Sequence, residues 1–140
     1  MANGGIIGPT QTPVVANQAQ LISAYSAPAT FTTQALTTTL TTVLLANGTA
    51  SGKVFKIESI MVANVDGTNA ADVTIDFHTA ANGTAGSSFA LAATISVPAD
   101  ATLNLVDKNS TFYLMENQSI IGGASANSDL EVVIAYEDIS

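Results

Sequence analysis

The sequence contains no cysteine, no tryptophan and no arginine. Without cysteine, the chain forms no disulfide, offers no thiolate nucleophile and has no cysteine-based zinc site. Three tyrosines and five phenylalanines are its whole aromatic content, so it has few of the flat rings on which sugars stack. These absences argue against thiol chemistry, cysteine-held zinc and carbohydrate recognition.

Charge is scarce and mostly negative. Charged residues make up 10% of the chain, against about 25% in ordinary soluble domains. The formal net charge is −8, and the basic side chains are Lys53, Lys56 and Lys108. A protein that neutralises nucleic-acid phosphates or anionic lipids needs several basic side chains on one face. We therefore expect no direct binding to nucleic acid or membranes, and we expect Lys53 and Lys56 to pair with nearby carboxylates.

Long apolar segments are missing as well. No run approaches the roughly 20 residues that span a bilayer, and the N-terminus lacks the basic and apolar regions of a signal peptide. The length of 140 residues is that of one domain. We expect one domain that is made in the cytoplasm.

Segments in which apolar and polar residues alternate are common in this sequence, whereas no long segment has the apolar spacing of a helix. The clearest alternation covers 71–79, where Val73, Ile75 and Phe77 occupy one face of the expected strand. The opposite face of this strand is polar and consists of Asp72, Thr74, Asp76 and His78.

The other expected strands are less regular. The threonine-rich segment 35–46 favours one strand or two short ones, because β-branched residues suit a pleated surface. The alternation in 89–97 predicts a buried face made of Phe89, Leu91, Ala93, Ile95 and Val97. Further strands are expected at 54–64, near the centre of a sheet, and at 102–106, 112–115, 119–121 and 130–136.

Turn sequences separate these segments. Asn47-Gly48, Asp66-Gly67 and Asn82-Gly83 offer the positive φ angles that tight hairpins require, and Gly122-Gly123 predicts a bulge or a bend. About eight strands with turns roughly every 8–15 residues are typical of a sandwich or barrel. The prediction is an all-β fold, a single jelly-roll-like β-sandwich of antiparallel strands over 30–140.

Residues 1–29 differ from the rest of the chain. They are rich in glycine and proline near the start and contain no charged side chain, whereas disordered tails are usually charged. We interpret them as an extended N-terminal arm that orders against a partner subunit. The alternative is a terminus without a partner. The partner-binding residues of the arm are expected to be Ile6, Ile7, Pro9, Val14, Val15, Leu21 and Ile22.

His78, the only histidine, is the first candidate for chemistry. Nucleophilic catalysis needs a serine on a constrained turn and donors for an oxyanion, and no G-x-S-x-G motif accompanies the histidine. Asp72, Asp76 and His78 also project from one strand face and offer ligands for a divalent cation, but one strand rarely supplies a full coordination shell. We interpret the three as a solvated face, and expect no catalytic residue, no metal and no cofactor.

Three segments carry a resemblance to a known family. They are KVFKIESIMVANVDGTNAADVTIDFH, FALAATISVPADATLNLVDKNSTFYLMENQSI and LEVVIAYEDIS, and the positions that match are 57–64, 73–75, 95–103 and 114–120. The chain resembles small virion structural proteins of tailed phages, and the opening MANGGIIGP is similar to virion proteins of phages with marine and cyanobacterial hosts. The resemblance implies a β-sandwich, often jelly-roll-like, and a place on the particle, and it carries over no catalytic residue.

The expected function is that of a non-enzymatic capsid decoration (cement) protein located on the virion. Its partners would be the major capsid protein or other virion subunits, and we expect a homo-oligomer, with a trimer favoured. Low charge suits this role because it lowers the desolvation cost of large protein contacts. The alternatives are a neck, tail or baseplate component and a receptor- or glycan-binding module.

Overall fold

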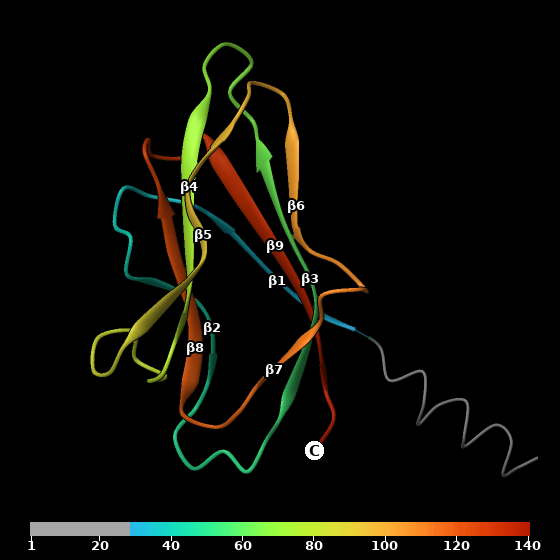
Figure 1. The fold of residues 1–140 in the computed structure, drawn as a ribbon. Coiled ribbons are helices and arrows are strands. Elements are labelled where there is room, and N and C mark those ends of the chain that lie inside the picture. The colour runs from blue at the N-terminus through green and yellow to red at the C-terminus, as the bar shows by residue number, and fades with distance from the viewer. Residues whose placement is uncertain (1–28) are drawn as a thin grey trace, which may run out of the picture.

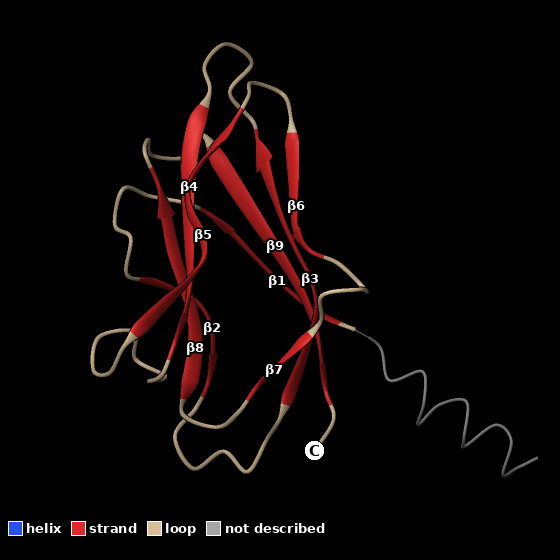
Figure 2. Cartoon of the chain, viewed as in Figure 1, coloured by secondary structure: helices blue, strands red, loops and turns tan. Residues whose placement is uncertain are grey.

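The computed structural model describes residues 29–140, which form nine β-strands and no helix (Figure 2). The strands are β1 (Thr30–Ala35), β2 (Thr42–Asn47), β3 (Phe55–Asn64), β4 (Ala71–His78), β5 (Ser88–Val97), β6 (Thr102–Val106), β7 (Phe112–Leu114), β8 (Gln118–Ala124) and β9 (Leu130–Asp138).

The strands form two antiparallel sheets that pack face to face (Figure 1). One sheet has the order β1-β9-β3-β6, with β7 pairing alongside the first residues of β3. The other has the order β2-β8-β4-β5. The predicted all-β sandwich is therefore confirmed.

The pairing of the strands is nested. With β7 set aside, β1 pairs with β9, β2 with β8, β3 with β6 and β4 with β5, while β3–β9 and β4–β8 contacts complete the sheets. The chain thus runs out and back as one long hairpin that is wound over itself. Two four-stranded sheets connected in this way are a jelly roll.

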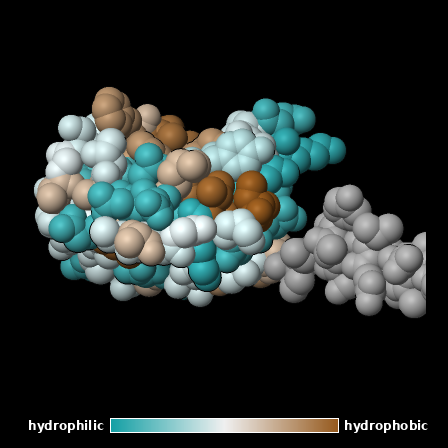
Figure 3. Space-filling model, turned by 90° about the horizontal axis from the view of Figure 1, so that it is seen from below, coloured by the Kyte–Doolittle hydropathy of each residue, from teal (hydrophilic) through white to brown (hydrophobic). Residues whose placement is uncertain are grey.

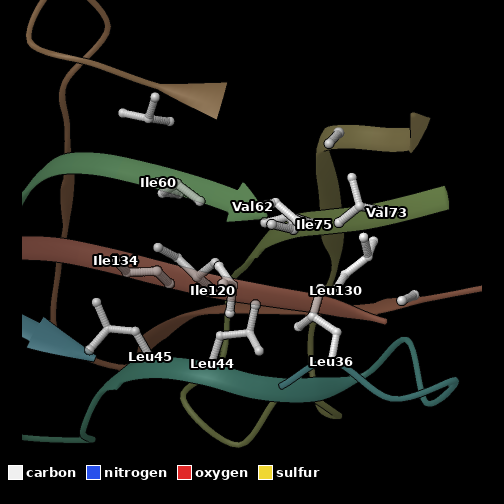
Figure 4. Packing of buried hydrophobic residues seen from close by; sticks show 14 of the residues in the cluster. Leu36, Leu44, Leu45, Ile60, Val62, Val73, Ile75, Ile120, Leu130 and Ile134 are labelled. Atoms are coloured by element: carbon white, nitrogen blue, oxygen red, sulfur yellow. The ribbon is translucent and has the colours of Figure 1, made fainter. Parts of the chain in front are cut away.

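The core lies between the two sheets. Apolar side chains from both inner faces point toward one another, among them Leu44 and Ile120 from one sheet and Ile60 and Ile134 from the other (Figure 4). Aromatic rings extend the contact at one end, where the Phe77 and Phe112 rings meet edge to face with their centroids 6.5 Å apart. Burial of these side chains is the main stabilising contribution to the fold.

The segment 35–46 is not one strand. β1 ends at Ala35, β2 begins at Thr42, and the residues between them form a linker. The linker has threonines where a strand would need apolar side chains for the core, and its Leu40 is exposed. It bonds instead to the last residue of β8, just beyond the start of β2, since the Thr37 carbonyl accepts a hydrogen bond from the Ala124 N–H at 2.8 Å.

The prediction for β5 was right for Val97, which is buried, and for Leu91, which packs against the core, but wrong for Phe89, Ala93 and Ile95. The register between β4 and β5 shifts twice, once on each side of Ile75, and Thr94 has a positive φ of 54°. These irregularities add residues to β5, so Ala92 is buried while Phe89 and Ile95 are exposed. A simple alternation therefore fails along this edge strand.

The glycine-containing turns also differ from the prediction. Of the three turn pairs, Gly83 alone has a positive φ. Asn47 instead ends β2 with its side chain buried, where its amide group donates to the carbonyl oxygens of Lys53 and Leu114 at 2.8 and 3.0 Å. Asn64 ends β3 in the same way, donating to Asn69 and Val97.

The Gly122-Gly123 pair is neither a bulge nor a bend. β8 runs through both residues in regular register with β4. The pair permits close packing, because a Cβ on Gly122 would lie 2.6 Å from the carbonyl oxygen of Thr74 in the neighbouring strand β4. A Cβ on Gly123 would lie 2.6 and 2.7 Å from the carbonyl oxygens of Thr39 and Thr37.

Candidate interaction surface

His78 is buried, which corrects the prediction of a solvated histidine. It does point away from the core, opposite Ser119 of β8, but the loop after β4 covers it and leaves it 3% exposed. Its Nδ1 atom lies 3.0 Å from both the backbone nitrogen and the carbonyl oxygen of Ala80. The Ser119 hydroxyl donates to that same carbonyl at 2.7 Å. The histidine therefore anchors a loop, and its ring nitrogen is engaged by backbone rather than by a serine or a carboxylate.

Asp72, Asp76 and His78 do not converge. Four residues of strand separate the two carboxylates by about 13 Å, which is too far for shared coordination of one ion. Within residues 29–140, no group of three or more His, Cys, Asp and Glu side chains is placed to hold a metal ion. Partial burial raises the pKa of Asp76, and the nearby His78 opposes this rise.

The outer face of the β2-β8-β4-β5 sheet is partly covered by the chain itself. The loop between β4 and β5 reaches across β8 and β2, where the Cβ position of Gly83 lies 2.9 Å from Val43 and 3.0 Å from Ile121. Ile121 points outward and is nevertheless 1% exposed. The linker before β2 covers Gly123 in the same way. A hollow of about 300 Å³ remains beside the linker, and Asp72 is the one ionisable group among its lining residues.

The outer face of the β1-β9-β3-β6 sheet is uncharged in its middle, and no other part of residues 29–140 covers it. Two rows of side chains cross it: Phe31, Ala135 and Ser59 lie opposite one another, as do Thr33, Val133, Met61 and Asn104. We call these seven residues the neutral face. Phe31 is 63% exposed and Met61 37% exposed, whereas Val133 is half-buried and Ala135 is buried between its neighbours.

Charged residues border the neutral face at both ends. Glu131 lies in the next row toward one end. Toward the other end, the Lys56 ammonium group lies 3.0 Å from a Glu58 carboxylate oxygen, with Glu137 and Tyr113 opposite Lys56. The hydrogen bond to Glu58 raises the pKa of Lys56.

Both predicted lysine pairs are present. Lys56 pairs with Glu58, and Lys53 lies 3.3 Å from Asp138. Exposed pairs of this kind contribute little to stability. Their effect here is to neutralise charge near the end that carries the C-terminus, where polar side chains surround small groups of apolar ones (Figure 3).

Sequence reasoning missed the neutral face. The arm residues to which it assigned partner binding, from Ile6 to Ile22, lie outside the described residues. The available signal was in β9, where both faces of the strand carry apolar residues. Such a pattern indicates either a covered strand or an exposed apolar face, and only the assembled sheet distinguishes the two.

Comparison with protein families, curated proteins and solved structures finds no match for this chain. Across residues 29–140 there is no helix with the length and apolarity needed to cross a bilayer.

Proposed function

We propose that this chain is a decoration protein of a tailed-phage capsid. It attaches to the outer shell through protein–protein contacts, and its partners are the major capsid protein and other copies of itself. The single observation that carries this proposal is the neutral face, an open and uncharged area on a domain whose net charge is −8.

The neutral face has the properties of the middle of a protein interface. Interface centres are depleted in charged residues and enriched in aromatic residues and methionine, and Phe31 and Met61 are exposed here. Covering this face removes no ionised group from water, so the desolvation cost is low. The carboxylates on the rest of the surface repel other acidic surfaces, so contacts through those parts of the domain are unfavourable.

The jelly-roll order supports the proposal without deciding it. Jelly rolls occur in viral capsid proteins, and also in lectins and cupins, and a fold alone does not specify a function. The resemblance of the sequence to phage virion proteins favours the first of these classes. The scarcity of aromatic residues weighs against the lectin class.

The test is to count and locate this chain in purified particles of the phage that encodes it. Quantitative mass spectrometry should give hundreds of copies per particle, and cryo-electron microscopy should place the neutral face against the shell. A count of about a dozen or fewer would assign the chain to the neck, tail or baseplate. Its absence from the particles would refute a virion role altogether.

A further inference from the structure

The free edges of the two sheets are not equally protected. The edge strands are β1, β6, β7, β2 and β5. β7 is only three residues long, and the pairing of β6, β2 and β5 with their neighbours contains register shifts. Such bulges discourage the pairing of an edge with another chain. β1 pairs with β9 in unbroken register over its whole length and carries no charge, no proline and no bulge. It is therefore the edge best suited to accept another strand.

The available backbone groups of β1 follow from its pairing with β9. The Leu36 N–H donates to the Leu130 carbonyl at 2.7 Å. In an antiparallel pair, residues that bond to the partner alternate with residues that point away. The N–H and C=O groups of Phe31, Thr33 and Ala35 therefore face outward, and β1 has no second neighbour among the described strands.

We propose that residues 14–27 of a second copy of this chain pair along β1 as an additional strand. This segment lies between Pro13 and Pro28, contains neither proline nor glycine, and carries no charge. It has a backbone N–H at every position and includes Val14, Val15, Leu21 and Ile22, residue types compatible with strand addition. The added strand would widen the neutral face rather than interrupt it with charge.

A second copy is the donor because the chain is poorly suited to turn back on itself before β1. The connection Ala27-Pro28-Ala29 has no glycine, asparagine or aspartate, the residues that tight hairpin turns require. Proline fixes its own φ and favours an extended conformation in the residue before it. These residue types favour a second copy over the same chain as the donor. The inference deepens the proposed function by naming a partner, and it leaves Ile6 and Ile7 for the shell.

The first test measures the oligomeric state of the full chain by light scattering. We expect the wild-type chain to form an oligomer, and Thr33→Pro to weaken its association about tenfold or more, because the ring removes an outward N–H and obstructs the edge. Thr33→Val keeps the N–H and should lose much less association than Thr33→Pro, which separates the backbone effect from the change of side chain. If Thr33→Pro fails to fold, Thr33→Lys keeps the N–H and places a charge at the edge instead. A monomeric wild-type chain, or folded edge variants that assemble normally, would overturn the proposal.

The second test identifies the donor by disulfide trapping, for which the absence of native cysteine gives a clean background. A chain with Thr33→Cys is mixed with chains that carry one cysteine at a position from 18 to 25, and the mixture is oxidised. We expect a disulfide-linked heterodimer at one or two neighbouring positions. Linkage only between two Thr33→Cys chains would show β1–β1 pairing, and no linkage to the arm would exclude the arm as donor. Either result would refute this inference without affecting the particle test of the proposed function.

Discussion

The two outer faces of the sandwich are built from similar strands but differ in how far the chain itself covers them. The face over β2-β8-β4-β5 is covered by its own loop and linker, and Asp72 and Asp76 are half-buried on it. The face over β1-β9-β3-β6 has no such cover from the described part of the chain and exposes Phe31 and Met61. Internal cover makes the first face part of the folding unit, whereas the second is left available to other molecules. The comparison shows that the low overall charge affects binding only where the uncharged residues lie on a face that the chain leaves open.

The largest effect is expected where the chain covers itself. Gly123→Ala would place a methyl group against two carbonyl oxygens of the linker, and overpacking against backbone should lower the free energy of unfolding by about 3 kcal/mol. Chemical denaturation of the full chain measures this change. Gly48→Ala is the control, because its Cβ position has no atom within 4 Å. Equal stability of the two variants would mean that the linker does not press on this face.

An intermediate effect is expected on the neutral face. Met61→Glu places a charge in the middle of the proposed contact, and it should weaken binding to shells that lack this protein about tenfold or more, because the new carboxylate must be desolvated. Stability should change by no more than about 0.5 kcal/mol, since Met61 is a surface residue. A co-sedimentation assay with purified shells measures the binding.

The matched control for Met61→Glu is Thr84→Glu. It adds the same charge on the exposed loop that covers the other face, so it separates a local effect from a change in net charge. If both variants bind shells equally well, or lose binding equally, the neutral face is not the contact.

The smallest effect concerns Asp76 and depends on pH. Burial raises the pKa of this carboxyl in the folded protein, so the folded state favours the protonated form more than the unfolded state does. Its contribution to stability is therefore fully present below the unfolded pKa and is lost as pH rises through the folded pKa. Asp76→Asn should stabilise the protein by no more than about 0.5 kcal/mol at neutral pH, with no gain in acid. Thermal melts across the pH range measure this, and a loss of stability at neutral pH would contradict it.

The sandwich could be predicted because its signals are local. The alternation of Val73, Ile75 and Phe77 reflects their shared inward face, and the strand at 54–64 was correctly expected at a sheet centre, since β3 lies between β9 and β6. The glycine and asparagine residues of the turn pairs were correctly predicted to lie at strand boundaries, but the way in which they act there was not predicted. Asn47 acts through its side chain, which bonds to segments far along the chain, and a dipeptide turn rule does not contain that information.

The surfaces could not be predicted because they depend on distant segments. His78 occupies an outward strand position, and it is buried only because the following loop folds over it. The opposite holds for Phe31, whose apolar ring stays exposed because nothing in residues 29–140 covers it. Alternation in the sequence indicates the side of a strand on which a residue lies. Cover by a loop decides whether that side is exposed to solvent. The register shifts in β5 add a further limit, since each one resets the alternation.

The nested pairing has a consequence for the timing of synthesis. β9 is the last of the nine strands to leave the ribosome, yet it lies between β1 and β3 and contributes Val133 and Ala135 to the middle of the neutral face. Until it emerges, β1 lacks the strand with which it pairs in residues 29–140, which is β9. The complete neutral face, and β1 as the edge of a formed sheet, therefore appear only after β9 has emerged. The earlier strands are meanwhile left without the central strand of their sheet, which is the stage at which unpaired edges are most prone to wrong contacts.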